Sequence, residues 1–321
     1  MPEKDKKYYI GIDLGGTFVK GGIVDEKGEI ITDGKVPTES EKGGEKVMDN
    51  IAALVSDLLK NTGLKKEDVE GIGMGVPGMI DSKNGIVVFS NNLRWHHLKI
   101  SEGVENRTGL KVKIANDANV AALGEAVYGA GSEVDDSILL TLGTGVGGGI
   151  IVGNKLVEGN RSAGAELGHM VIEHGGEQCT CGRKGCLEAY ASATALIRDT
   201  KRAMEAHKDS KMWEIGSLDA VTGKTAFDYE KTDVYAKEVV DKYVEMLACG
   251  IANIANIFRP HKVLIGGGVC AQGDNLLVPL QKIVDREIFA GELGPKCPIA
   301  IAKLGNKAGI LGAAALIADI N

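Results

Sequence analysis

The first apolar segment of the chain reads Tyr8-Tyr-Ile-Gly-Ile-Asp-Leu-Gly-Gly-Thr17, a strand that breaks into a glycine turn. The pattern predicts a return strand over Phe18 to Val24, a turn at Asp25 to Gly28 and a third strand that ends at Val36. A second segment of the same form reads Ser137-Ile-Leu-Leu-Thr-Leu-Gly-Thr-Gly-Val-Gly-Gly-Gly-Ile-Ile-Val152. The unit of strand, glycine turn and strand therefore occurs twice.

These two segments align with each other without a gap. Leu14 falls on Leu142, and the same offset pairs Gly15 with Gly143, Gly21 with Gly149, Ile23 with Ile151, Val24 with Val152 and Lys27 with Lys155. The matches include apolar strand positions as well as glycines, which favours an internal duplication.

Strands and helices alternate along the rest of the chain, which predicts an α/β fold. The apolar spacing predicts strands at 69–76, 111–115 and 262–265, and helices at 47–59, 119–128, 191–206, 234–257 and 307–320. A chain of 321 residues is long enough for two domains, each with its own core.

The composition excludes several classes of protein. Glycine supplies 45 residues, about double the average share, but the glycines show no collagen period and 44% of the residues are hydrophobic, so neither a fibre nor a disordered chain fits. Lys and Arg total 37 against 44 Asp and Glu, a net charge of −7, and there is no basic block. Nucleic acid is therefore not expected as a partner.

The chain also lacks signals for export or membrane insertion. Its first seven residues have no apolar core of a signal peptide, and no apolar run reaches the ~18 residues of a membrane span. We expect a soluble, cytoplasmic protein without a membrane partner.

Three glycine turns follow apolar strands, at Gly15-Gly16, Gly143 to Gly149 and Gly266 to Gly268, and they hold much of the glycine excess. Bare backbone amides in such turns cradle phosphates, although a tight hairpin without a ligand is the alternative for any single turn. Gly143 to Gly148 matches the dinucleotide pattern G-x-G-x-x-G but leads into a strand, where that motif opens a helix. Gly223-Lys-Thr225 resembles the end of a P-loop, but Leu218 stands in place of its first glycine.

Three of the six cysteines lie in the eight-residue segment Cys179-Thr-Cys-Gly-Arg-Lys-Gly-Cys186. In a chain without an export signal, this density favours a metal site over disulfides. A closed tetrahedral zinc site needs a fourth ligand, for which His169 and His174 are the nearby candidates.

Asp13-Leu-Gly-Gly-Thr17, Leu142-Gly-Thr-Gly145 and Gly266-Gly-Gly268 resemble the phosphate-1, phosphate-2 and adenosine motifs of the sugar kinase/actin/Hsp70 superfamily. The resemblance implies two ribonuclease-H-like domains, of the actin/hexokinase/Hsp70 type, around a nucleotide cleft. It implies that Mg²⁺ lies near Asp13 and adenosine beside Gly266. The implied ATP-binding residues are Asp13, Gly15, Gly16, Thr17, Lys20, Gly143, Thr144, Gly145, Gly266 and Gly267.

Glu166-Leu-Gly-His169 and the cysteine segment that follows it resemble the signature of the ROK family of repressors, open reading frames and kinases. The resemblance extends over nearly the whole chain. It implies a structural Zn²⁺ held by His169, Cys179, Cys181 and Cys186, in a segment 169–186 that shapes the sugar site. His174 is then left out, and His169 can bind zinc with one ring nitrogen and sugar with the other.

Asn116-Asp117 comes between a strand and a helix, where an N-cap is the simple interpretation. The resemblance instead implies that Asp117 is the general base that takes the proton from a sugar 6-hydroxyl. It implies sugar contacts from Asn92, Asn116, Asp117, Glu166, His169 and Glu188. For Glu166 and Glu188, the alternative is ordinary surface charge.

The cysteine segment and the residues after it most resemble those of bacterial ROK glucokinases, which predicts ATP-dependent phosphorylation of D-glucose. The alternatives are N-acetylmannosamine, N-acetylglucosamine, fructose or allose as the substrate. A sugar-responsive repressor is disfavoured, because only seven residues precede Tyr8 and the net charge is −7. The resemblance also implies a smaller domain of 1–116 with 306–321, a larger domain of 117–305, and a homodimer or homotetramer.

Overall fold

The computed structural model describes residues 6–319, with the side chain at position 292 left out. It contains two five-stranded sheets of the same strand order. The first runs β3 (Ile30–Pro37), β2 (Phe18–Asp25), β1 (Tyr8–Leu14), β4 (Val69–Val76), β8 (Val112–Asn116). The second runs β11 (Lys155–Leu156), β10 (Val146–Val152), β9 (Ser137–Leu142), β12 (Lys262–Gly266), β13 (Ile299–Ile301). The repeated order agrees with the duplication read from the two glycine segments.

Each sheet mixes parallel and antiparallel neighbours, and helices separate many of the strands in sequence. The helices are α1 (Gly44–Thr62), α2 (Ile100–Thr108), α3 (Asp117–Tyr128), α4 (Glu188–Ala191), α5 (Ala193–Ala206), α6 (Thr225–Tyr229), α7 (Val234–Phe258), α8 (Asp274–Glu287) and α9 (Ala308–Ala318). A small sheet adds β5 (Met79–Asp81), β6 (Ile86–Ser90) and β7 (Trp95–Leu98). The predicted α/β class is confirmed.

The chain divides into two compact units. One holds the described residues within Met1–Asp136, Gly149–Ala165 and Lys303–Asn321, and the other holds Ser137–Gly148 and Glu166–Ala302. The domain limits implied by the family resemblance, 1–116 with 306–321 and 117–305, stay a prediction. Of the helix predicted at 307–320, position 320 lies outside the described residues.

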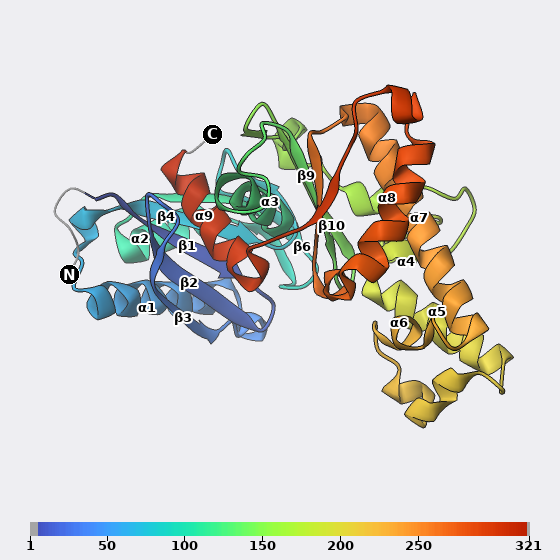
Figure 1. The fold of residues 1–321 in the computed structure, drawn as a ribbon. Coiled ribbons are helices and arrows are strands. Elements are labelled where there is room, and N and C mark those ends of the chain that lie inside the picture. The colour runs from blue at the N-terminus through green and yellow to red at the C-terminus, as the bar shows by residue number, and fades with distance from the viewer. Residues whose placement is uncertain (1–5, 320–321) are drawn as a thin grey trace. The chain divides into compact units, whose positions relative to one another are not determined.

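In the first unit, α1 and α2 contribute to one apolar core with the first sheet. Val47, Ile51, Val55 and Leu58 recur at helical spacing on α1 and are buried against the strands. Residues of α9 pack in separate clusters with β1, β2 and α3, and Figure 1 shows α9 lying across β1 and β4. The first sheet is therefore covered on both faces.

Glycines let α9 approach its neighbours backbone to backbone. A Cβ added to Gly11 would lie 1.9 Å from the carbonyl oxygen of Ile310, and one added to Gly73 would lie 1.8 Å from that of Ala313. A Cβ on Gly312 would lie 1.7 Å from the carbonyl oxygen of Val120 in α3. Close helix packing therefore accounts for part of the glycine excess, which the sequence patterns had assigned chiefly to the turns.

A buried carboxylate fixes the return of the chain to the first unit. Glu125 of α3 is fully buried and accepts hydrogen bonds from the amides of Ala130 (2.9 Å), Lys303 (3.0 Å) and Leu304 (2.7 Å). A buried carboxylate is stable only when its oxygens are satisfied in this way.

The second unit is built around α7, which contacts α4, α5, α6 and α8. The helix predicted over 191–206 is interrupted, because Ser192 has extended backbone between α4 and α5. Its hydroxyl caps α5 by accepting a hydrogen bond from the amide of Ala195 (3.1 Å). The cap makes α4 a separate single turn that starts at Glu188.

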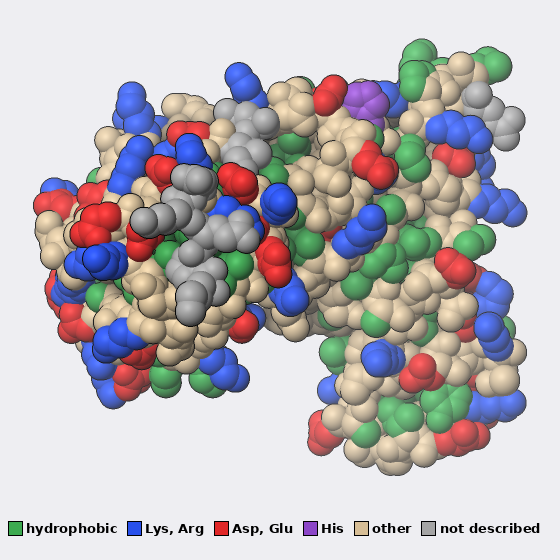
Figure 2. All heavy atoms as spheres, turned by 60° about the vertical axis from the view of Figure 1, so that its left-hand side comes forward, with side chains coloured by type: hydrophobic (Ala, Val, Ile, Leu, Met, Phe, Trp, Pro, Cys, Tyr) green, Lys and Arg blue, Asp and Glu red, His purple; other side chains and the backbone are tan. Residues whose placement is uncertain are grey.

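The surface carries both signs of charge. On the face shown in Figure 2, Lys and Arg side chains lie among Asp and Glu side chains. Within residues 6–319, no helix combines the length and hydropathy needed to cross a bilayer.

Candidate functional site

In the first unit, Asp13, Asn116 and Asp117 lie at one edge of the sheet. Parallel pairing places Asp13 of β1 beside Gly75 of β4, and Gly75 beside Ala115 of β8. Asn116 and Asp117 follow Ala115 directly, so they lie at the same carboxyl edge as Asp13. Ligands of α/β sheets bind outside this edge.

The first glycine turn is held from behind by Thr38, a buried residue that follows β3. Its hydroxyl donates to the carbonyl of Gly15 (2.7 Å), and its amide donates to the carbonyl of Thr17 (2.9 Å). Gly16 and Thr17 remain exposed at the tip of the turn, and Gly16 has open space where a side chain would be. This arrangement leaves bare backbone toward solvent, as a phosphate site requires.

Asp13 lies between a lysine and a helix. Nζ of Lys20 is 3.7 Å from its carboxylate, and a Cβ on Gly309 of α9 would lie only 2.7 Å from its Cγ. Burial raises the pKa of the Asp13 carboxyl, and Lys20 opposes that shift. Lys20, predicted as a phosphate contact, is thus an ion-pair partner of Asp13.

Asn116 is the N-cap of α3, which is the simple interpretation of its sequence position. Its Oδ1 accepts from the amides of Ala118 (2.9 Å) and Asn119 (3.3 Å), while its Nδ2 donates to the carbonyl of Gly78 (3.1 Å). The cap places Asp117 as the exposed first residue of α3. Asn92 is exposed in the turn between β6 and β7.

In the second unit, the second and third glycine turns meet at one sheet edge. Thr141 of β9 pairs with Gly266 of β12, so the turns after both strands lie together. Gly267 has a φ of 85°, and a Cβ there would lie 2.3 Å from the carbonyl oxygen of Leu142. Only glycine fits at position 267. The third glycine loop therefore contacts the backbone of Leu142, the residue that precedes the turn Gly143 to Gly145.

The four predicted zinc ligands converge. The ligand atoms of His169, Cys179, Cys181 and Cys186 all lie within 4.8 Å of one another, and His174 is not in the group. Sγ of Cys179 is 3.7 Å from Nδ1 of His169, and the sulfurs of Cys181 and Cys186 are 3.7 Å apart. Ligands at tetrahedral Zn²⁺ distances are separated by about 3.6–3.8 Å, so donor set and spacing both fit a closed zinc site.

The protonation of the thiols differs with burial. Burial raises the pKa of Cys179, and it raises the pKa of Cys186 to about 12. A backbone hydrogen bond from Arg183 lowers the pKa of the exposed Cys181. Because a metal ion binds thiolates, its binding would release the protons of the two buried thiols.

Glu188 links residues 169–186, here called the metal segment, to the second glycine turn. Its Oε1 accepts from Thr180 Oγ1 (2.9 Å) and lies 3.5 Å from Cys179 Sγ, while Oε2 accepts from the amide of Val146 (3.1 Å). A carboxylate with these partners is not free surface charge. Glu166 is exposed, and its carbonyl accepts from the amide of His169 (3.0 Å).

The patterns in the sequence missed two residues of this region, Thr180 and Thr194. Thr194 donates from Oγ1 to the carbonyl of Thr144 (2.7 Å), and the amide of Ala193 donates to the carbonyl of Gly143 (2.8 Å). Threonine at a helix start is common, so only the fold shows that this one holds the glycine turn.

Comparison with known proteins identifies the family. The pattern described as "ROK family" matches residues 9–320. The chain belongs to the ROK family. Over 313 residues, this ROK protein is 39% identical to a glucokinase of Thermotoga maritima, which covers 97% of each chain. It is 37% identical to a glucokinase of Halalkalibacterium halodurans over 314 residues. That alignment covers 97% of this chain and 95% of the relative.

A solved structure supports the fold as well. The ROK family glucokinase from Streptomyces griseus, in complex with glucose and AMPPNP, matches with a TM-score of 0.80 and 38% identity, over 96% of this chain and 98% of that chain. The ROK protein described here is a sugar kinase, and the predicted actin-like α/β fold is confirmed.

Proposed function

We propose that the protein transfers the γ-phosphoryl group of ATP to the 6-hydroxyl of D-glucose, giving ADP and glucose 6-phosphate. The observation that carries the proposal is the double contact of Glu188 with Thr180 in the metal segment and Val146 after the glycine turn. A segment predicted to bind sugar and a turn predicted to bind phosphate thus share one carboxylate. The similarity to glucokinases supports glucose as the acceptor.

Asp117 is the proposed general base. It takes the proton of the 6-hydroxyl as the oxygen attacks the γ-phosphorus in line, and the bond from phosphorus to the β,γ-bridging oxygen of ADP breaks. Its exposed place at the start of α3 leaves the carboxylate accessible to substrate. Asn92, Asn116, Glu166, His169 and Glu188 are the proposed sugar ligands, since carboxylates, amides and imidazoles satisfy hydroxyl groups.

The proposed nucleotide site uses the amides of Gly15, Gly16, Gly143 and Gly145 with the hydroxyls of Thr17 and Thr144 for phosphates. Gly266 and Gly267 flank adenosine. Asp13 and Lys20, which form an ion pair, are the residues proposed to recognise a nucleotide-bound Mg²⁺ and the phosphate oxygens. Mg²⁺ supplies charge neutralisation of the phosphoryl oxygens when it is bound.

The zinc site has a structural role in this proposal. Three thiols and one imidazole leave no open position on a tetrahedral ion. Nδ1 of His169 faces Cys179, which leaves Nε2 for a sugar hydroxyl. A zinc ion bound by these four side chains would hold residues 169–186 in the shape that presents His169 and Glu188.

The test is a coupled assay of ADP release with ATP and a panel of hexoses. We expect the highest kcat/KM with D-glucose. A higher kcat/KM with N-acetylmannosamine, N-acetylglucosamine or fructose would replace the substrate but keep the reaction. Absence of ADP release with every sugar, together with tight DNA binding, would support a sugar-responsive repressor instead.

A further inference from the structure

Helix α4 is a single turn, and it carries Glu188 as its first residue. One helical turn is unstable on its own, and its terminal carbonyls have no partners within the helix. Its orientation must therefore come from neighbouring elements. Two side chains from longer helices supply it.

The first side chain is Arg198 of α5. Its Nη1 donates to the carbonyl of Ala189 in α4 (2.9 Å). The second is the buried Tyr243 of α7, whose hydroxyl donates to the carbonyl of Ala191 (2.7 Å). Both bonds reach the turn that presents Glu188.

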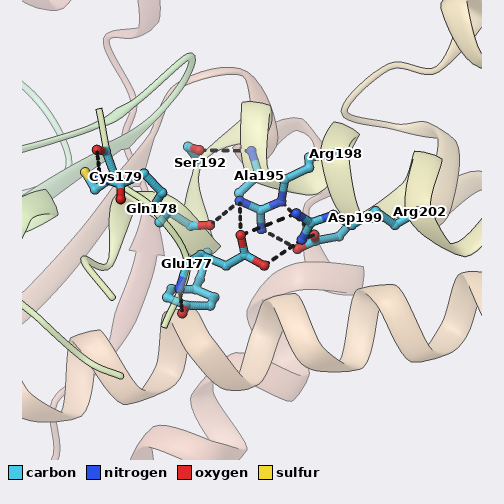
Figure 3. Close-up of polar contacts among 10 residues, drawn as sticks. Glu177, Gln178, Cys179, Ser192, Ala195, Arg198, Asp199 and Arg202 are labelled. Carbon is cyan, nitrogen blue, oxygen red and sulfur yellow. Dashed lines mark hydrogen bonds and ion pairs between the residues drawn. The ribbon is translucent and has the colours of Figure 1, made fainter. Parts of the chain in front are cut away.

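Two carboxylates orient the guanidinium of Arg198. Nε and Nη2 each donate to a different oxygen of Asp199 at 2.8 Å, and Nη1 lies 3.8 Å from Oε2 of Glu177. Figure 3 shows Glu177 and Asp199 beside the guanidinium groups of Arg198 and Arg202. The bidentate pair fixes the plane of the guanidinium, so that Nη1 faces Ala189.

Glu177 belongs to the metal segment, two residues before Cys179. Its amide donates to the hydroxyl of Tyr190 in α4 (2.6 Å), and its carbonyl accepts from the amide of Gly185 (2.8 Å). Arg198 thus contacts α4 directly and the metal segment through Glu177. We call Arg198, Glu177 and Asp199 the arginine clamp.

We infer that Arg198 is a positioning residue, which through the arginine clamp holds Glu188 in place to bind sugar and holds the metal segment against α5. This inference rests on the proposed function in one respect, the role of Glu188 as a sugar ligand. Its second consequence, retention of the metal, does not depend on that role.

Arg202 provides a matched control on the same helix. It donates to Glu177 (2.6 Å) and lies 3.4 Å from Asp199, so it shares the carboxylates of Arg198. Within residues 6–319, its hydrogen bonds go to these carboxylates and not to α4. Its side chain is 55% exposed, against 27% for Arg198.

The test compares Arg198→Met with Arg202→Met in the zinc-loaded protein. A cavity of about 280 Å³ borders both arginines, so a methionine has room at either position. We expect Arg198→Met to raise the KM for glucose about tenfold, the scale of one lost charged hydrogen bond, with kcat changed less than twofold. We expect zinc transfer to a chromophoric chelator to become about three to ten times faster. Arg202→Met should leave the KM for glucose near the wild-type value, because Arg202 does not contact α4, but it should also speed zinc transfer, because Arg202 donates directly to Glu177 of the metal segment.

General damage to the fold would give a different result, because a smaller active fraction lowers kcat and leaves KM unchanged. Arg198→Lys keeps the positive charge but loses the planar set of N–H donors of the guanidinium. Its KM for glucose and its zinc-transfer rate should lie between those of wild type and Arg198→Met. The inference is overturned if Arg198→Met keeps either the wild-type KM for glucose or the wild-type rate of zinc transfer. If wild type phosphorylates no hexose, the proposed function fails, and the zinc-transfer rate alone decides the role of Arg198.

Discussion

Oγ1 of Thr194 donates a hydrogen bond of 2.7 Å to the carbonyl of Thr144, which lies in the second glycine turn. The neighbouring amide of Ala193 donates to the carbonyl of Gly143 at 2.8 Å. The start of α5 therefore occupies two carbonyls of the turn, and the turn takes one orientation. The same helix bears Arg198 one turn further on, so α5 supports both the glycine turn and the metal segment.

Removal of the Thr194 hydroxyl should weaken nucleotide binding. Thr194→Val keeps the shape of the side chain but removes the donor, and a net loss of about 1 kcal/mol corresponds to a rise of about fivefold in the KM for ATP. The KM for glucose should stay unchanged. Thr194→Ser retains the donor and should behave as wild type; an unchanged ATP KM in the valine variant would show that the bond does not position the turn.

Replacement of the proposed base should stop catalysis without unfolding the protein. In Asp117→Asn, the cap of α3 is kept because Asn116 provides it, so thermal stability should remain near wild type. We expect kcat to fall about 10²–10⁴-fold, the range for loss of a general base. Steady-state kinetics and thermal unfolding on the same preparation check this. A near-normal kcat would remove Asp117 from the role.

Loss of one metal ligand should release zinc and loosen the sugar segment. Cys181→Ser removes the exposed thiol of the cluster, and we expect bound zinc to fall well below about one ion per chain, with a higher KM for glucose. Metal analysis and kinetics measure the two effects. Cys270→Ser, which lies outside the cluster, serves as the control. Full activity of the metal-free protein would argue against a structural role for zinc.

The sequence predicted the site best at positions where only one residue type serves, such as glycine in a tight turn or cysteine in a metal cluster. Glycine turns after apolar strands and three closely spaced cysteines predicted the sheet edges and the metal cluster. The bonds of Thr194 and Arg198 could not be predicted in this way, because each joins elements that are separate in sequence. Helix α8 was missed although its apolar spacing is regular, and Pro279 within it obscures the pattern.

The family resemblance places residues 306–321 with the first domain, but the glycines on which α9 packs could not be predicted from the sequence, for a physical reason. In the sequence, Gly11 and Gly73 are simply glycines inside predicted strands, where glycine lowers strand stability. Their role is seen only when α9 is found packed against them. A turn glycine has a local signal in its neighbours, but a packing glycine has its partner elsewhere in the chain.

Loss of the Glu125 carboxylate should destabilise the first unit. Glu125→Ala leaves the amides of Ala130, Lys303 and Leu304 without their acceptor, and we expect the free energy of unfolding to fall by about 3 kcal/mol or more. Denaturant unfolding measures it. Glu133→Ala, at an exposed position of the same region, should change stability by less than about 0.5 kcal/mol. Equal stability of the two variants would contradict the role assigned to Glu125.

Tyr128 should make stability depend on alkaline pH. Its hydroxyl is buried without a hydrogen-bond partner among the described residues, and burial raises its pKa to about 12. Above pH ~10 the unfolded chain loses this proton while the native state keeps it, so stability falls between pH ~10 and 12. Tyr128→Phe should remove that part of the fall and add about 1 kcal/mol at pH 7. If wild type and Tyr128→Phe lose the same free energy of unfolding between pH 7 and pH ~12, the prediction is contradicted.

The position of α9 has a consequence for biosynthesis. This helix completes the core of β1 and β4, but the ribosome makes it only after all of Glu166–Ala302. During translation, the face of β1 that carries Gly11 therefore stays uncovered while the second unit emerges and folds. The first unit begins folding first and finishes last, so a truncated nascent chain that stops before Ala308 would expose this glycine-lined face to chaperones.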